Sequence, residues 1–206
     1  FPLKIRPYIV ISDILTIENR LLEAEQVLLL ARNVDPGNSD LLYNFSRLYW
    51  SGKNYGLALK NINKAIDLNN NIDTYKIFKS DVLICRDQID EALSILSVLK
   101  SDEKNNNQLQ INILLSQIYI RKKMFKNAEE VLFKLVNEYS HLEIGYLNLS
   151  DLYVVTKELD KGINIIKKGL SLFPNYLPLY KNLATIYKNN GLLDKAIEIH
   201  LSIIKK

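Results

Sequence analysis

Small residues recur along the chain at a fixed spacing. One column is made of alanines with a single glycine, and a second column, twelve residues earlier in each unit, is made of serines with a single alanine. Successive members of both columns stand 34, 34, 36, 34 and 34 residues apart. The first column is Ala24, Ala58, Ala92, Ala128, Gly162 and Ala196, and the second is Ser12, Ser46, Ser80, Ser116, Ser150 and Ala184. Two columns with one shared period predict six tandem copies of one supersecondary unit.

Large apolar residues surround these columns at helical spacing. In the fifth unit Tyr146, Leu149 and Tyr153 follow the i, i+3, i+7 pattern of one helical face. A polar break at residues 157–158 precedes a second stripe, which contains Ile163, Ile166 and Leu170. Small side chains suit places where two helix axes approach, and Pro36 and Pro174 are expected to end second helices because proline lacks the amide donor. Each unit is therefore predicted to be an antiparallel helix pair that must stack on its neighbours.

Three units share a motif of aromatic, small and apolar positions in a fixed order. The second unit supplies Phe45, Ser46, Tyr49, Tyr55, Ala58, Ile62 and Ala65; the fifth supplies Tyr146, Leu149, Ser150, Tyr153, Gly162, Ile166, Gly169 and Pro174; the sixth supplies Tyr180, Leu183, Ala184, Tyr187, Gly191 and Ala196. This motif resembles the tetratricopeptide repeat. The resemblance implies an all-α fold, a right-handed α-solenoid of about twelve helices. We place the repeats at 5–38, 39–72, 73–108, 109–142, 143–176 and 177–206, within a single domain over 1–206.

The third unit departs from the pattern. It is two residues longer than the others, and Lys76 and Lys79 stand where apolar residues are expected. A one-residue shift of its first helix would instead bury Tyr75, Phe78 and Val82. We favour this shift, with an extra residue in the turn near residues 86–87 and a longer polar loop at residues 105–107.

The last unit ends at Lys206, before its second helix should finish, and no polar capping helix follows. Terminal repeats normally need such a cap to be soluble. We therefore interpret the chain as an excerpt of a longer protein. The uncapped C-terminal face is a candidate surface for self-association.

Composition and charge exclude several classes of function. The chain is 48% hydrophobic and 24% charged, near the globular average, and its net charge of +4 comes from 27 basic and 23 acidic residues. Basic runs such as residues 121–123 are too short to form the concentrated face that nucleic acid requires. The apolar runs are too short for a transmembrane helix. We expect no nucleic-acid partner and no membrane insertion.

Residues suited to catalysis are few. His141 lies in a turn between units and His200 at a core column, so the two histidines are not expected to share a metal site. Cys85 has no partner histidine at a recognisable spacing and is interpreted as a half-buried structural cysteine. Neither a phosphate-binding glycine loop nor a nucleophile elbow is present, and carboxylate pairs such as Glu129 and Glu130 begin second helices, where they favour the helix dipole. We predict no enzyme activity, no cofactor and no metal.

The inner surface of the array is the informative one. In solenoids of the resembled family, first helices line a concave groove, and here a second apolar stripe lies beside the core stripe. Such a helix exposes more apolar surface than its own hairpin covers. Packing between adjacent first helices is the alternative use of these side chains. The predicted partner-binding residues are Tyr43, Arg47, Trp50, Ile77, Ile113, Gln117, Ile120, Leu147 and Asp151, with Asp13 and Thr16 on the same stripe of the first unit.

The resemblance and the missing chemistry together predict a protein–protein interaction scaffold. It would bind a partner peptide or helix in the groove, with Tyr43 and Trp50 as aromatic anchors. The alternative is a substrate-recruiting arm of a larger enzyme, of glycosyl- or sulfotransferase type, whose catalytic domain lies outside this chain. No signal-peptide pattern is visible, which favours a cytoplasmic location, while a periplasmic or lipid-anchored parent stays open.

Overall fold

The computed structural model describes residues 5–102 and 105–204 of the 206-residue chain, and these residues form twelve α-helices and no strand. The helices are α1 (Arg6–Ile17), α2 (Leu21–Val34), α3 (Ser39–Ser51), α4 (Tyr55–Leu68), α5 (Asp73–Cys85), α6 (Ile89–Ser101), α7 (Gln108–Arg121), α8 (Phe125–Glu138), α9 (Glu143–Thr156), α10 (Leu159–Leu172), α11 (Leu177–Asn189) and α12 (Leu193–Ile204). The predicted all-α solenoid of about twelve helices is thereby confirmed in its class and its helix number.

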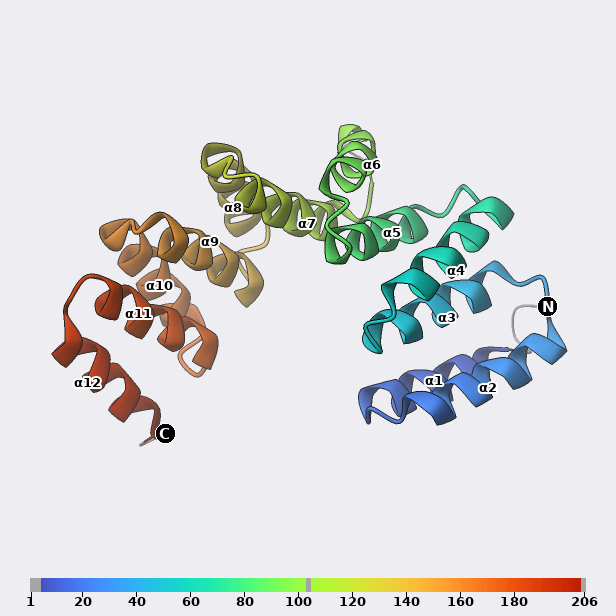
Figure 1. Ribbon diagram of the computed structural model, residues 1–206. Helices are drawn as coiled ribbons and strands as arrows, with labels where there is room; N and C mark the ends of the chain where they lie inside the picture. The colour runs from blue at the N-terminus through green and yellow to red at the C-terminus, as the bar shows by residue number, and fades with distance from the viewer. Residues whose placement is uncertain (1–4, 103–104, 205–206) are drawn as a thin grey trace. The chain divides into compact units, whose positions relative to one another are not determined.

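The helices divide into two compact units. Unit 1 spans Phe1–Asn107 and holds α1–α6, coloured blue to green in Figure 1, and unit 2 spans Gln108–Lys206 and holds α7–α12. Within each unit successive helices pair as antiparallel hairpins, α1 with α2 through α11 with α12. Inside each unit a second helix also packs on the first helix of the following hairpin: α2 on α3 and α4 on α5 in unit 1, and α8 on α9 and α10 on α11 in unit 2. A single domain over residues 1–206 stays a prediction.

The two columns of small residues lie at the helix contacts. Every member of both columns is buried, and Ser46 Oγ donates a hydrogen bond of 2.7 Å to the carbonyl of Ala58, which joins the two columns within one hairpin. A larger side chain in either column would separate the two helices of its hairpin. The period seen in the sequence is therefore the period of closest helix approach.

Local signals set the helix ends. The side chain of Asn38 accepts a hydrogen bond of 3.2 Å from the amide of Leu41 and caps α3, and Asn54 caps α4 in the same way through Leu57. The helices α2 and α10 end two residues before Pro36 and Pro174, as predicted.

The hairpin turns repeat a feature that the sequence reasoning missed. One residue in each turn has a left-handed backbone, with φ between 58° and 75°. The next amide donates to a carbonyl five residues back, for example Asn54 to Tyr49 at 2.8 Å, which completes a Schellman turn. The left-handed residues are Asn19, Lys53, Asp87, Lys123, Lys157 and Gly191. Only the sixth turn uses glycine, the residue that adopts this conformation without a steric penalty from Cβ.

The third repeat keeps its register, so the predicted shift of its first helix is wrong. Ser80 and Leu83 are buried in their original columns, and the turn between α5 and α6 has the same length as in the first two repeats. Both additional residues lie in the loop between α6 and α7, whose predicted polar character at residues 105–107 is confirmed.

The three residues named for the shift are nevertheless buried: Tyr75, Phe78 and Val82 belong to the cluster that α5 forms with α4. The helix therefore buries two adjacent stripes rather than one displaced stripe. Lys79 stays at its unshifted position, and its ammonium group lies 3.1 Å from the Glu91 carboxylate on α6. This ion pair explains how a lysine is tolerated at a position that holds the buried Phe45 in the preceding repeat.

Large and small residues alternate where a second helix meets the next first helix. In unit 2 a Cβ added at Gly145 on α9 would lie 2.6 Å from Leu135 Cδ2 on α8, and one added at Gly169 on α10 would lie 2.7 Å from Leu179 Cδ1 on α11. The large residue thus comes from the second helix at one junction and from the first helix at the next. Each junction holds one large and one small side chain at this point of contact.

Candidate functional site

The first helices of unit 1 line a small polar cavity at the predicted partner-binding surface. It has a volume of about 120 Å³ and receives residues from α1, α3 and α5. Its lining residues are Ser12, Asp13, Thr16, Asn44, Arg47, Leu48, Trp50, Ser51 and Phe78. Two predicted site residues, Arg47 and Trp50, therefore share one cavity, and Asp13 and Thr16 of the same stripe join them.

Arg47 ties the helices of this cavity together. Its guanidinium donates to Asp13 Oδ1 on α1 and to Asn44 Oδ1 on α3, both at 3.0 Å, and it lies over the Tyr43 ring with Cζ 5.8 Å from the ring centroid. The Arg47 and Asp13 side chains are 42% and 41% exposed, so the ion pair stays accessible to a ligand. An exposed pair of this kind contributes about 1 kcal/mol or less to folding, which leaves it available for recognition.

Trp50 is the unusual member of the cavity. Its indole Nε1 is buried, yet no acceptor for its N–H exists among the described residues. A buried donor without an acceptor is destabilising by about 1–3 kcal/mol.

Trp50 packs against Phe78, which belongs to a cluster of aromatic rings. Tyr43 stacks on Tyr75 with centroids 5.1 Å apart, and Phe78 packs edge-on against both Tyr43, at 5.4 Å, and Trp50, at 6.2 Å. Burial raises the pKa of Tyr43. Because rings packed in this way have few alternative rotamers, the indole is held in place before any ligand arrives.

Ile77 does not belong to an accessible surface. It is fully buried, because α5 covers a second stripe beside the one that packs on α4. The prediction that a partner contacts Ile77 directly is therefore wrong for this structure. The alternative reading, that some of these side chains serve packing, is the correct one at this position.

The remaining predicted residues lie on α7 and α9 of unit 2. Ile113, Ile120 and Leu147 are half-buried, whereas Gln117 and Asp151 are exposed. Asp151 Oδ1 accepts a hydrogen bond of 2.7 Å from Asn182 Nδ2 on α11. Their role in binding stays a prediction.

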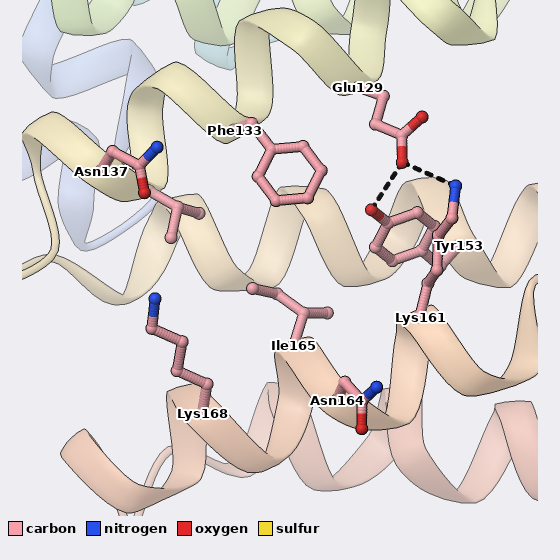
Figure 2. A pocket seen from close by; sticks show the side chains of 9 residues that line it. Glu129, Phe133, Asn137, Tyr153, Lys161, Asn164, Ile165 and Lys168 are labelled. Carbon is pink, nitrogen blue, oxygen red and sulfur yellow. Dashed lines mark hydrogen bonds and ion pairs between the residues drawn. The ribbon is translucent and has the colours of Figure 1, made fainter.

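A larger groove lies on unit 2 at a place that the sequence reasoning did not select. It has a volume of about 450 Å³ and runs between the second helices α8 and α10, with Tyr153 of α9 at one end. Figure 2 shows Phe133 of α8 and Ile165 of α10 pointing toward each other across the groove. Lys168 and Asn137 lie at the opposite end from Tyr153.

A hydrogen-bonded triad occupies the Tyr153 end of this groove (Figure 2). Glu129 Oε1 accepts from the Tyr153 hydroxyl at 2.8 Å and from Lys161 Nζ at 2.9 Å. The bond from Lys161 is the main cause of the lowered pKa of Glu129, and burial together with the Glu129 carboxylate raises the pKa of Tyr153. All three polar groups have partners, so the triad joins α8, α9 and α10.

One sequence signal could have found this groove. Phe133 is 45% exposed on a second helix whose other exposed residues are all polar. A large aromatic residue on that outer stripe marks apolar surface left open between neighbouring second helices.

The residues weighed for chemistry are spread over the chain. Cys85 is half-buried, as predicted, and His141 is exposed. His200 is also exposed, so its interpretation as a core histidine is wrong: α12 is the last described helix, and no described helix packs on that face. Over the described ranges, His, Cys, Asp and Glu form no group of three or more that could hold a metal ion. None of the described helices is long and apolar enough to span a membrane.

Comparison with known proteins confirms the resemblance noted in the sequence. The family model of the tetratricopeptide repeat matches residues 39–72, which is the second repeat as placed above. No curated protein matches the chain in sequence. The chain is thus similar to tetratricopeptide repeat proteins, with the repeat itself identified at α3 and α4.

Solved structures share the fold over nearly the whole chain. PilW, described as a widely conserved type IV pilus biogenesis factor, superposes with a TM-score of 0.83 at 14% identity, covering 97% of this chain and 91% of its own. PilF of Pseudomonas aeruginosa gives 0.76 at 15% identity, covering 98% and 90%. YrrB, a repeat protein with an unusual peptide-binding site, gives 0.57 at 17% identity, covering 86% and 91%. At these identities the likeness establishes the all-α solenoid fold.

Proposed function

We propose that this chain is a non-catalytic scaffold that binds a partner protein through an extended peptide segment laid across α1, α3 and α5 of unit 1. The observation that carries the proposal is the buried indole N–H of Trp50, which has no acceptor among the described residues. The repeat fold supports it, since proteins of this fold commonly bind peptides on their first helices, and YrrB is one structural neighbour with a peptide-binding site.

The geometry favours an extended segment over a helix. Backbone carbonyls of a helix are already bonded within the helix, except in its last turn, whereas those of an extended peptide are free to accept. A carbonyl placed at Trp50 Nε1 would satisfy the indole, and an apolar ligand side chain would pack on the ring of Phe78. Asp13 and Arg47, which stand 3.0 Å apart, would then meet polar or charged groups of the ligand on either side.

The chain carries its own reporter for this proposal, because Trp50 is its single tryptophan. Peptides selected from a displayed random library against the chain serve as probes. Binding at the cavity is expected to change the emission of Trp50, since the indole gains a hydrogen bond and loses contact with solvent. Binding anywhere else would leave the emission unchanged.

Three variants locate the site by calorimetry with the selected peptides. Trp50→Phe keeps the aromatic contact and removes the N–H, and the expected loss is about tenfold in affinity, which corresponds to one hydrogen bond of about 1.4 kcal/mol. Arg47→Gln is expected to weaken peptides that carry an acidic group. Val98→Ser, at an exposed apolar position on α6, is the matched control and should bind like the wild type. Equal affinity of all variants, with unchanged emission, would overturn the proposal.

A further inference from the structure

The groove between α8 and α10, which we call the α8–α10 groove, differs from the equivalent place in the other repeats. Phe133 of α8 and Ile165 of α10 face each other across it (Figure 2). Other successive second helices of one unit hold these pairs at the same repeat positions: Leu29 and Asn61 for α2 and α4, Asn63 and Ile95 for α4 and α6, and Lys167 and Ile199 for α10 and α12. Each of those pairs contains a polar residue. Within the units, only the α8–α10 groove is therefore apolar on both sides at this point.

The apolar part of the groove is open to solvent. Ile165 is 8% exposed and belongs to the buried core of unit 2, whereas Phe133 is 45% exposed. Ile165 thus forms part of the floor and Phe133 forms a wall. The volume of about 450 Å³ is within the range of ligand pockets and leaves room for a large side chain with its main chain. An apolar group inserted beside the Phe133 ring would remove this surface from water.

The two ends of the groove differ in charge. At the Tyr153 end the ammonium group of Lys161 lies 2.9 Å from the Glu129 carboxylate and 2.7 Å from that of Glu158, so its charge is balanced. At the other end Lys168 extends from α10 toward the side of the groove on which Asn137 lies (Figure 2). Within the described part of the chain, neither the Lys168 ammonium nor the Asn137 side-chain amide has a hydrogen-bond or ion-pair partner.

These two polar groups together select a carboxylate. An ammonium group donates hydrogen bonds and carries a positive charge, and the side-chain amide of asparagine adds further N–H donors. A carboxylate accepts from both, and the bond from lysine is charge-assisted. The α8–α10 groove therefore combines an apolar contact with an unbalanced positive charge at one end.

The spacing of these features fits a short extended peptide. Lys168 follows Ile165 by three residues, and Asn137 follows Phe133 by four, so each wall places its polar group about 5–6 Å from its apolar one. Side chains two residues apart in an extended chain lie on the same side, about 6.5–7 Å from each other. A helix of so few residues would not be stable by itself. The spacing thus favours an extended segment over a short helix.

We propose that the α8–α10 groove is a second binding site, which takes an extended segment of a partner protein with a large apolar residue and, two positions away, Asp or Glu. The apolar side chain lies between Phe133 and Ile165, and the carboxylate accepts hydrogen bonds from Lys168 and Asn137. The lining residues come from α8, α9 and α10 of unit 2. The peptide site proposed above uses α1, α3 and α5 of unit 1, so either proposal can fail while the other holds.

A titration followed by nuclear magnetic resonance tests the site. The probe is a capped synthetic peptide with leucine, serine and glutamate in this order between two glycines, together with the peptide of reversed order, because the segment can run in either direction. Each is added to the isotope-labelled chain from about 10 μM to about 5 mM, a range that covers weak binding. The amide signals of Phe133, Asn137 and Lys168 are expected to shift and saturate with at least one peptide, while the emission of Trp50 in unit 1 stays unchanged.

Charge variants identify the contact. Lys168→Gln should weaken the glutamate peptide about fivefold, the equivalent of an exposed ion pair. Lys167→Gln is the matched control: it removes the same charge from the neighbouring exposed residue, which does not line the groove, and should bind like the wild type. Lys168→Glu should bind a peptide with lysine in place of glutamate more tightly than the wild type does.

An apolar variant and a small molecule complete the test. Phe133→Ser, which introduces the residue that Ser97 provides at this repeat position, should weaken the peptide about tenfold. 4-Phenylbutyrate offers a ring and a carboxylate without a peptide backbone and should bind more weakly than the peptide. Circular dichroism of each variant confirms that the helices are intact before affinities are compared.

Four results would overturn the proposal. The first is the absence of shifts at the groove residues over the whole range with both peptides. The second is equal weakening by Lys167→Gln and Lys168→Gln, which would indicate unspecific attraction. The third is tighter binding of 4-phenylbutyrate than of the peptides, which would make a small anion the occupant. The fourth is a set of groove shifts that changes with protein concentration alone, which would make a second copy the occupant.

Discussion

Unit 1 keeps one order of small and large residues at its helix junctions, whereas unit 2 reverses that order at one of its two junctions. In unit 1 the second helices contribute small residues, Ala31 and Ala65, and the following first helices contribute large ones, Leu41 and Tyr75, which belong to the same buried clusters. In unit 2 the junction of α8 and α9 reverses this order, with Leu135 on the second helix and Gly145 on the first.

The next junction of unit 2 returns to the unit 1 order, with Gly169 on α10 and Leu179 on α11. The repeat frame therefore fixes the combined volume at each junction and leaves open which helix supplies it. Close packing explains this freedom, because a filled interior responds to total volume and to voids rather than to the origin of each side chain.

The largest expected effect comes from upsetting this balance at the junction of α8 and α9. Gly145→Leu forces a large side chain against Leu135 and should destabilise the chain by about 3 kcal/mol, and Leu135→Ala should cost about 3 kcal/mol through the cavity it leaves. The double variant should be destabilised by about 1–3 kcal/mol less than the sum of the two single variants, because the new leucine at position 145 can occupy the cavity that Leu135→Ala leaves. Urea unfolding followed by circular dichroism measures all three. Strict additivity would show that the two positions do not share volume.

A smaller effect is expected at Tyr75, which stands on α5 at the repeat position that Gly145 holds on α9. Its hydroxyl donates a short hydrogen bond to the Asp40 carboxylate, which a residue such as Gly145 cannot provide in unit 2. Tyr75→Phe should therefore lower the free energy of unfolding by about 1–1.5 kcal/mol. Tyr180→Phe on α11 is the comparison variant: its hydroxyl donates a solvent-exposed hydrogen bond of 2.9 Å to the carbonyl of Pro174, so its loss should change stability less. A silent Tyr75→Phe would mean that the hydroxyl is equally well hydrated in the unfolded chain.

The same tyrosine predicts a loss of stability at alkaline pH. Burial, followed by the hydrogen bond to Asp40, raises the pKa of Tyr75 to about 12, and burial together with Glu25 raises that of Tyr49 to about 12. An unfolded tyrosine ionises near about 10, so above that pH the unfolded state binds fewer protons than the folded state. Stability should be constant below about pH 10 and fall as pH rises toward about 12. The double variant Tyr49→Phe, Tyr75→Phe should show a shallower fall, because Tyr153, Tyr43 and Tyr55, whose pKa values are also raised, still contribute.

Two hairpin turns of unit 2 carry different residues at the left-handed position, and substitutions there are expected to change the free energy of unfolding by about 1 kcal/mol. Lys157 and Gly191 hold the same left-handed turn position with φ of 59° and 75°. Lys157→Gly should stabilise the chain by about 0.5–1 kcal/mol and Gly191→Ala should destabilise it by about 1 kcal/mol, because only glycine adopts this conformation without strain from Cβ. Thermal unfolding of the two variants gives the signs directly. Two changes of the same sign would contradict the assignment of strain to this position.

The smallest expected effect concerns Lys79 in unit 1. Its ion pair with Glu91 is partly exposed, and such pairs contribute about 0–1 kcal/mol. Lys79→Met keeps the length of the side chain and buries apolar surface at a position that holds Phe45 in the preceding repeat, so stability should rise by about 0.5 kcal/mol. A loss of more than about 1 kcal/mol would show that the charge interaction of Lys79 with Glu91, rather than the packing of the lysine side chain, stabilises the α5–α6 hairpin.

Much of this architecture is readable in the order of residues. Helical pairs, the two small columns and the six repeat positions follow from the spacing alone, because a helix that packs at close quarters needs a small residue once per unit at a fixed place. Part of the candidate site is readable in the same way: Arg47 and Trp50 stand on the stripe beside the core, and they line one cavity with Asp13. The left-handed turn position was hidden because Asn, Lys and Asp fill it as well as glycine.

The tertiary structure decided which other residues each apolar helix face contacts. Periodicity assigns Ile77 and Trp50 to the same face, yet Ile77 is fully buried while Trp50 lines a cavity and lacks an acceptor for its N–H among the described residues. It assigns His200 to the core, yet burial there requires a neighbouring helix that α12 does not have among the described residues. A sequence determines the face of a helix on which a residue lies, because that depends on local geometry. Whether that face is covered depends on neighbours brought together by packing, and this only the folded chain decides.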